Sequence, residues 1–192
     1  MKEKMNVKVM ALLLAATLMV GGVIGGTIAW LIDKTDSVVN EFTYGDIDIE
    51  LTESTGDTYH ITPGNDISKD PTVTVKAGSE KCWLFVKISK ENWPTFTEED
   101  GTTKKIGYEL AAGWTFLKTE DGNDIYWREV AAADSDSSFA VLKNDKVTVS
   151  GNLTKEEVNA ITGNAKLTFT AYAVQNDKNI TTASDAWSKI SE

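Results

Sequence analysis

The chain has 192 residues, enough for one domain with a substantial hydrophobic core, and its 41% hydrophobic and 25% charged residues are typical of a globular protein. It carries 29 acidic against 19 basic residues, a net charge of −10, which repels nucleic acid and anionic lipid surfaces. The single cysteine, Cys82, excludes an intramolecular disulfide and a four-cysteine zinc site. We therefore expect no nucleic-acid partner and no disulfide framework.

The first 29 residues have the layout of a secretory signal peptide. Three lysines lie within the first eight residues, and the next 24 positions, 9–32, carry no charge. The run T-I-A ends at Ala29, which predicts signal peptidase cleavage between Ala29 and Trp30. A retained transmembrane helix is the alternative, but four glycines between positions 21 and 26 weaken it and no basic cluster follows. Both interpretations export the rest of the chain.

The remainder of the chain is dominated by strand patterns. The segment "DIDIEL" (46–51) alternates acidic and apolar residues, as a half-buried strand does. Further strands are predicted, with turn signals such as Pro63-Gly64-Asn65 between them, at 71–76, 82–89, 113–118, 124–130, 138–143, 146–150 and 166–174. The 82–89 strand is apolar on both faces and is expected at the centre of a sheet. These features predict an all-β, jelly-roll-like antiparallel β-sandwich.

Two short helices are expected within this β domain. Thr154 and Glu157 form a capping-box pattern before "KEEVNAI", and "TTASDAWSKI" near the C-terminus places Trp187 and Ile190 on one helical face. The predicted organisation is a signal peptide over 1–29, an N-terminal segment over 30–45 and a sandwich domain over 46–192. A signal helix would precede the sandwich.

Residues with catalytic potential are few. His60 is the only histidine, whereas a zinc hydrolase usually needs two or three, and no H-E-x-x-H motif is present. Neither Cys82 nor any serine lies in a nucleophile motif. Acidic clusters at 97–101, 119–124 and 133–138 offer oxygen ligands of the kind calcium prefers, yet they are better explained as solvated loops. We expect no catalytic residue, no metal ligand and no cofactor.

The tryptophans allow two interpretations. Trp83, Trp114 and Trp127 lie within strand patterns, which favours packing in the core. The alternative is an aromatic platform that binds carbohydrate, as many β-sandwiches carry. This second interpretation leaves a carbohydrate- or surface-binding module as a possible function.

Two stretches carry a resemblance to a known family. A glycine-rich apolar segment, a T-x-A cleavage pattern and "NEFTYGDIDIELTE" (40–53) together resemble the TasA/camelysin (CalY) family. The segment "PGNDISKDPTVTVKAGSEKCWLFVKI" (63–88) is also similar to members of that family. The resemblance covers about residues 1–90 and is most specific at the junction between the signal segment and the first strand.

The resemblance implies a function and a set of assembly residues. Family members are exported by Gram-positive bacteria, are processed by a SipW-type signal peptidase, and form jelly-roll domains that assemble into extracellular fibres of the biofilm matrix. The segment freed by cleavage is implied to pair as a strand in the next subunit. In this chain the implied donor residues are Trp30, Leu31, Ile32, Val38, Val39 and Phe42.

We therefore expect a secreted, non-enzymatic fibre subunit at the cell surface or in the extracellular matrix of a Gram-positive bacterium. Its partners would be copies of itself and related matrix proteins, with membrane contact only through the uncleaved signal segment. The resemblance also offers a competing function, because camelysin relatives are labelled cell-surface metallopeptidases. The sequence supplies no zinc motif for that activity.

Overall fold

The computed structural model describes residues 32–34, 47–55, 60–132, 134–161 and 165–190. The chain divides into two compact units after Trp30, and all the described residues belong to the second unit, Leu31–Glu192. The predicted cleavage site and most of the predicted donor residues lie outside the described residues: Ala29, Trp30, Leu31, Val38, Val39 and Phe42. Within the described residues, no helix has the length and apolar character needed to cross a membrane.

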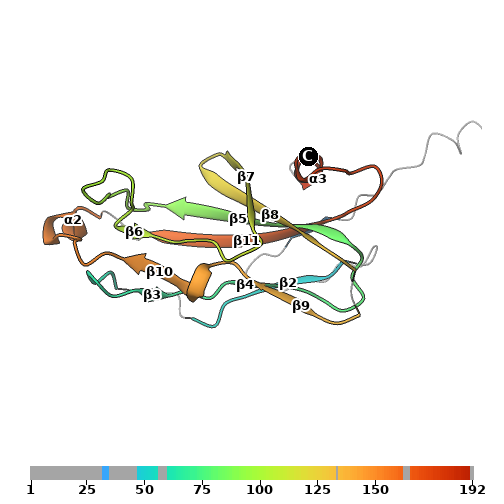
Figure 1. Cartoon of the computed structure of the whole chain (residues 1–192), viewed down its shortest axis with the longest axis horizontal. Coiled ribbons are helices and arrows are strands. Elements are labelled where there is room, and N and C mark those ends of the chain that lie inside the picture. The colour runs from blue at the N-terminus through green and yellow to red at the C-terminus, as the bar shows by residue number, and fades with distance from the viewer. Residues whose placement is uncertain (1–31, 35–46, 56–59, 133, 162–164, 191–192) are drawn as a thin grey trace, which may run out of the picture. The chain divides into compact units, whose positions relative to one another are not determined.

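The described unit is a sandwich of antiparallel strands, as predicted from the sequence (Figure 1). One layer is a five-stranded sheet, whose strands in spatial order are β1 (Ile32–Lys34), β11 (Lys166–Gln175), β5 (Cys82–Glu91), β8 (Asn123–Val130) and β7 (Thr115–Glu120). The facing layer contains two three-stranded sheets. The first consists of β2 (Ile49–Thr52), β4 (Thr72–Val75) and β9 (Ser137–Ala140), and the second of β3 (Ile67–Ser68), β10 (Lys146–Val149) and β6 (Ile106–Gly107).

The two longest strands, β5 and β11, are neighbours in the five-stranded sheet. They pair along all ten residues of each strand, from Lys166 opposite Glu91 to Gln175 opposite Cys82. Alternate residues of β5 face the other layer, where Leu84, Val86 and Ile88 are fully buried in the main core. The central position predicted for the 82–89 segment is therefore confirmed.

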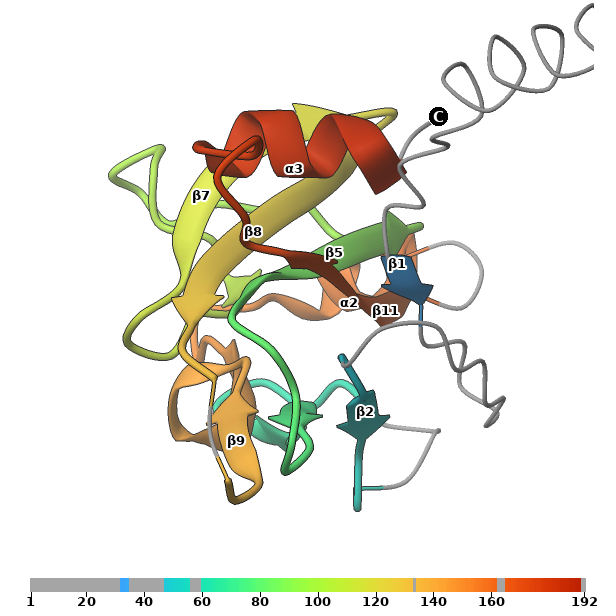
Figure 2. The same cartoon turned by 90° about the vertical axis from the view of Figure 1, so that its right-hand side faces the viewer.

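The outer face of the same sheet is buried beneath helix α3 (Ala183–Ile190), which lies across it in Figure 2. Trp187 packs its ring 5.3 Å from Phe85 and 5.4 Å from Tyr172. Thr182 caps the helix by accepting a hydrogen bond from the Asp185 amide at 3.1 Å. Both faces of β5 are thus removed from water, which explains its continuous apolar pattern.

Within the described residues, the predicted elements agree with the structure in type. Every predicted strand segment overlaps a strand, although β9 ends at Ala140 rather than at the predicted residue 143. Helix α2 (Lys155–Ala160) begins with the predicted capping box between Thr154 and Glu157. The predicted signal helix lies outside the described residues. A 3₁₀ turn, η1 (Lys143–Asp145), lies between β9 and β10. The two-residue strands β3 and β6 were not predicted, because two residues carry no detectable alternation.

Candidate strand-binding groove

The edge of the five-stranded sheet at β11 is only partly covered. β1 pairs with its C-terminal half alone, with Ile32 opposite Val174 and Lys34 opposite Tyr172. On the side away from β5, residues 166–170 have no strand partner within the described part of the chain. An uncovered strand edge presents backbone N–H and C=O groups that can pair with another strand.

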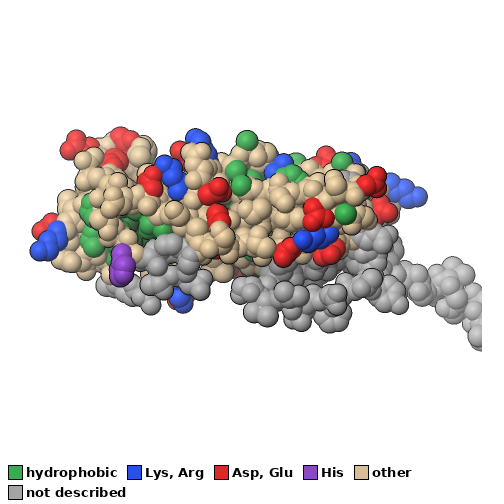
Figure 3. Space-filling view, turned by 90° about the horizontal axis from the view of Figure 1, so that it is seen from below, with side chains coloured by type: hydrophobic (Ala, Val, Ile, Leu, Met, Phe, Trp, Pro, Cys, Tyr) green, Lys and Arg blue, Asp and Glu red, His purple; other side chains and the backbone are tan. Residues whose placement is uncertain are grey.

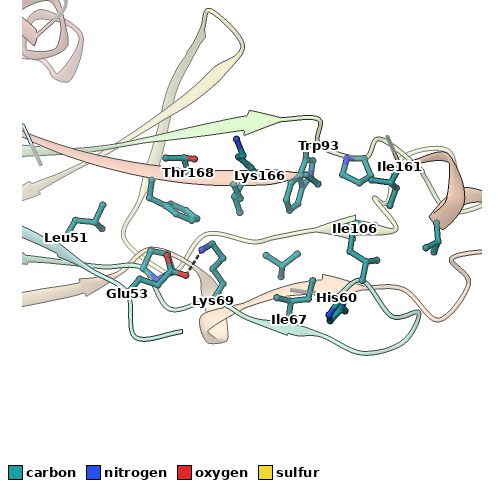
Figure 4. A pocket seen from close by; sticks show the side chains of 18 of the residues that line it. Leu51, Glu53, His60, Ile67, Lys69, Trp93, Ile106, Ile161, Lys166 and Thr168 are labelled. Atoms are coloured by element: carbon teal, nitrogen blue, oxygen red, sulfur yellow. Dashed lines mark hydrogen bonds and ion pairs between the residues drawn. The ribbon is translucent and has the colours of Figure 1, made fainter. Parts of the chain in front are cut away.

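A groove of about 860 Å³ lies beside this uncovered edge, between the two layers (Figure 4). Its upper wall comes from β11 and the residues after β5, and its lower wall from β2, β3, β6 and β10. The apolar side chains that line these two walls are Leu51, Ile67, Trp93, Ile106, Val147, Leu167 and Phe169. In the space-filling view from below, hydrophobic side chains are visible where this face is hollowed (Figure 3).

Helix α2 closes one end of the groove. Val158, within the helix, and Ile161, at its C-terminal cap, both line the groove. The helix is held at its start by the capping box, in which Thr154 accepts from the Glu157 amide at 3.2 Å. Lys105, beside β6, binds both carboxylate oxygens of Glu157 at 2.9 Å. These contacts lower the pKa of Glu157, the hydrogen bond from the Thr154 amide first and Lys105 second.

The rim of the groove carries paired charges. Lys69 forms an ion pair with Glu53, drawn as a dashed line in Figure 4, and Lys166 binds Glu91 at 3.1 Å. His60 is exposed and also lies on the groove. Polar and apolar groups therefore both contribute to the lining of the groove.

Asp70 fixes the chain that follows β2. Its carboxylate accepts hydrogen bonds from the backbone amides of Ser54 at 3.0 Å and Thr55 at 3.1 Å, and from both hydroxyls. These bonds, led by that from the Ser54 hydroxyl, lower the pKa of Asp70 from 3.8 to about 2. The carboxylate is thereby kept charged, and it holds the lower wall of the groove in place.

The opposite edge of the sandwich is closed. Trp114, just before β7, donates a hydrogen bond from Nε1 to the Ala140 carbonyl of β9 at 2.9 Å and so joins the two layers. Arg128 of β8 lies 3.8 Å from the Phe139 ring centroid and 5.4 Å from that of Trp114. Its buried Nε has no hydrogen-bond partner within the described residues. At this edge, aromatic rings and the Arg128 guanidinium thus fill the space between the two layers. At the other edge, the corresponding space is the groove.

The residues with catalytic potential are not assembled into a reactive site. Cys82 is buried in the core, and burial raises the pKa of its thiol to about 12. His60 is exposed at the groove instead. Among the described residues, no group of three or more His, Cys, Asp or Glu side chains lies close enough to hold a metal ion. In the predicted acidic cluster at 97–101, Asp100 accepts hydrogen bonds from Thr102 and Thr103 and closes its own turn.

The three strand tryptophans pack within the protein, as expected. Trp83 is buried and lies edge-on to Trp127, with ring centroids 5.2 Å apart. Trp114 packs against the main core. The sequence did not indicate the groove, whose lining comes from segments far apart in the chain. One feature of the local sequence could have indicated the groove. Val158 and Ile161 are an apolar pair that the short helix α2 cannot bury by itself.

Comparison of the chain with protein-family models, with curated proteins and with solved structures gave no match. The fold and the groove are therefore interpreted from their own geometry and from the resemblance described above.

Proposed function

We propose that the chain is a secreted structural subunit of extracellular biofilm-matrix fibres, in which the N-terminal segment of one copy pairs as a strand with the next. The observation that carries this proposal is a groove beside the part of β11, residues 166–170, that no strand pairs with on its outer side within the described residues. A strand added there would satisfy the backbone groups of residues 166–170 and bury its own apolar side chains. An acceptor at one place and a donor at another give a head-to-tail contact that does not close, which produces a filament.

The resemblance to the TasA/camelysin family supports the remaining parts of the proposal. Export by a Gram-positive bacterium, removal of residues 1–29 by a SipW-type signal peptidase and assembly with related matrix proteins follow from it. The groove also gives a physical reason why assembly would follow cleavage of the signal segment. While Trp30 remains joined to the uncleaved signal segment, the N-terminal strand is held at the membrane and is not free to enter another subunit. Cleavage therefore acts as the switch for polymerisation.

The competing functions have less support from the described residues. A zinc peptidase uses several histidine ligands, whereas this chain has His60 alone. A carbohydrate site presents aromatic faces together with many polar groups. Here Trp93 and Phe169 are the aromatic side chains among the described lining residues other than His60, and the charges at the rim, Lys69 and Lys166, are paired. We therefore propose no enzymatic activity.

The test is to measure the intact mass of the protein from culture supernatant and to examine the same fraction by electron microscopy. We expect a mature N-terminus at Trp30 and filaments. Replacing Trp30-Leu31-Ile32 with Ser-Gly-Ser should give a folded monomer, because the donor loses its apolar side chains. A processed wild-type protein that stays monomeric at all concentrations would rule out the fibre function. Chelator-sensitive peptidase activity would favour the camelysin-like alternative.

A further inference from the structure

We infer that Asp121 is a site of spontaneous isoaspartate formation, whereas Asp100, which lies in the same tripeptide sequence, is protected by the fold. The chain contains the tripeptide Glu-Asp-Gly twice, at 99–101 and at 120–122. The first copy lies in the loop before β6, and the second forms the turn between β7 and β8. This inference does not depend on the proposed function, because the only other reactant is water.

The reaction joins the aspartate side chain to the backbone that follows it. The amide nitrogen of Gly122 attacks Cγ of the Asp121 carboxyl group, and the carboxyl hydroxyl leaves as water together with the amide proton. The product is a five-membered succinimide ring. Water then adds to one of the two ring carbonyls. Addition at the side-chain carbonyl restores aspartate, and addition at the main-chain carbonyl gives isoaspartate, in which the main chain runs through Cβ. Glycine favours the attack because no Cβ crowds its nitrogen.

In the β7–β8 turn, both reacting groups are without a partner. Among the described residues, the Asp121 carboxylate accepts no hydrogen bond, and the Gly122 amide donates none. The Asn123 side chain donates to the main-chain carbonyl of Asp121 instead, at 3.3 Å. Both turn residues are exposed, and a Cβ on Gly122 would have nothing within 4 Å. The side chain is therefore free to turn toward the Gly122 nitrogen, and water reaches the ring that forms.

At Asp100, both reacting groups are engaged. The carboxylate accepts hydrogen bonds from the amides of Thr102 at 2.7 Å and Thr103 at 2.8 Å, and from the Thr103 hydroxyl at 2.5 Å. These bonds, led by that from the Thr103 hydroxyl, lower the pKa of Asp100 from 3.8 to about 2. The carboxylate is therefore kept ionised, which makes its carbon a poor target for attack. The Gly101 amide donates to the Glu98 carbonyl at 2.9 Å, so the attacking nitrogen is engaged as well.

Isoaspartate at position 121 would alter the turn that holds Glu120. Glu120 pairs with Asn123 across the hairpin, and its carboxylate accepts a hydrogen bond from Nε1 of Trp187 in α3 at 2.9 Å. Isoaspartate adds one carbon to the main chain of a two-residue turn, and loop length fixes the register of the two strands in a hairpin. The Glu120–Trp187 contact is therefore expected to weaken in the isomerised chain.

The first test incubates the purified protein at physiological temperature and maps isoaspartate by peptide mass spectrometry. Isoaspartyl methyltransferase with a labelled methyl donor identifies the modified peptides. In the folded protein, isoaspartate should accumulate at Asp121 at least about tenfold faster than at Asp100, a difference of about 1.4 kcal/mol in activation free energy. Equal rates at the two sites, or a faster rate at Asp100, would overturn the inference.

Unfolding provides a matched control, because the two tripeptides are identical in sequence. In concentrated urea, the rates at the two sites should differ by less than about threefold, which is about 0.7 kcal/mol in activation free energy. A tenfold preference that persists in urea would come from the neighbouring sequence and would refute protection by the fold.

Asp121→Glu provides the second control. It keeps the negative charge, but its longer side chain requires a six-membered ring and gives no isoaspartate. The methyl-acceptor signal of the folded protein should therefore fall at least about tenfold in this variant. A signal equal to that of the wild type would place the modified residue elsewhere. In the isomerised wild-type fraction, the NMR signal of the Trp187 indole N–H should shift, and an unchanged signal would contradict the expected effect on α3.

Discussion

The two edges of the sandwich differ in how they are closed. At the β7–β9 edge, Trp114 bonds across the layers to Ala140 and Arg128 is stacked on Phe139. At the opposite edge, where β1, β11 and β2 lie, the described side chains leave a groove of about 860 Å³ beside the part of β11 that no described strand covers. The first edge is completed by its own side chains, whereas the second presents the surface that another strand would bury. Among the described residues, only the second edge therefore combines an unpaired stretch of strand with a groove, which is the feature on which the proposed function rests.

The closed edge should be sensitive to loss of its aromatic anchor. Trp114→Ala removes a half-buried indole, its hydrogen bond to the Ala140 carbonyl and its contact with Arg128. We expect the free energy of unfolding to fall by about 3 kcal/mol, the lower end of the range for large aromatic residues. Urea unfolding measures this change. Phe116→Ala is the control, since Phe116 is 53% exposed and should cost less than about 1 kcal/mol. Similar losses in the two variants would mean that this edge is not sealed by Trp114.

A second substitution tests how tightly Arg128 is held. Gly113 has a φ of +91°, and a Cβ at this position would lie 2.9 Å from a terminal nitrogen of Arg128. Gly113→Ala should therefore strain the backbone and displace the guanidinium, with a loss of about 2 kcal/mol in thermal or urea unfolding. Gly122→Ala has a comparable φ of +78° and nothing within 4 Å of its Cβ. Gly122→Ala therefore measures the cost of backbone strain alone. If both variants lose the same free energy of unfolding, the contact with Arg128 contributes nothing.

At the open edge, the end of the groove depends on the capping box of α2. Thr154→Ala removes the acceptor for the Glu157 amide and should cost about 1 kcal/mol. Thr154→Ser keeps the hydroxyl acceptor, so it should change the free energy of unfolding by only about 0.3 kcal/mol. Hydrogen exchange at the Val158 amide, which bonds to the Thr154 carbonyl at 3.0 Å, provides the local measurement. Unchanged protection in Thr154→Ala would show that packing alone holds this end of the groove.

The smallest expected effect is the pH dependence at the lower wall. The pKa of Asp70 is about 2 in the folded chain, against an ordinary value of 3.8. Its stabilising contribution is therefore complete above pH 4 and is lost as the pH falls through about 4 to 2. Asp70→Asn should be less stable than the wild type at pH 7, with the difference shrinking over that window. If the stability difference between wild type and Asp70→Asn stays constant down to pH 2, it comes from changed packing or hydrogen-bond geometry and not from loss of the carboxylate charge.

The sequence predicted most of the fold because its patterns are local. Alternation in "DIDIEL" and the two-sided apolar run at 82–89 correctly predicted a half-buried strand and a central strand. Thr154 and Glu157 predicted the start of α2 for the same reason, since a capping box spans three residues. The groove was not predicted, because Leu51 and Phe169 lie in strand patterns like those of ordinary core residues, and Ile106 lies in no predicted element. Whether their side chains meet a neighbour or face a hollow depends on the spacing of the two layers.

The sequence by itself determined the all-β class, the central strand, both helices and the expectation of export, because each depends on the periodicity or composition of a short segment. Only the tertiary structure decided that Arg128 fills one edge, while at the other no described strand pairs with residues 166–170 on the outer side of β11. Strand order and register set which edges are covered, and these arise from pairings such as β1 with β11, whose residues are about 140 positions apart in the chain. No local pattern encodes a contact over that separation, and the candidate binding surface depends on it.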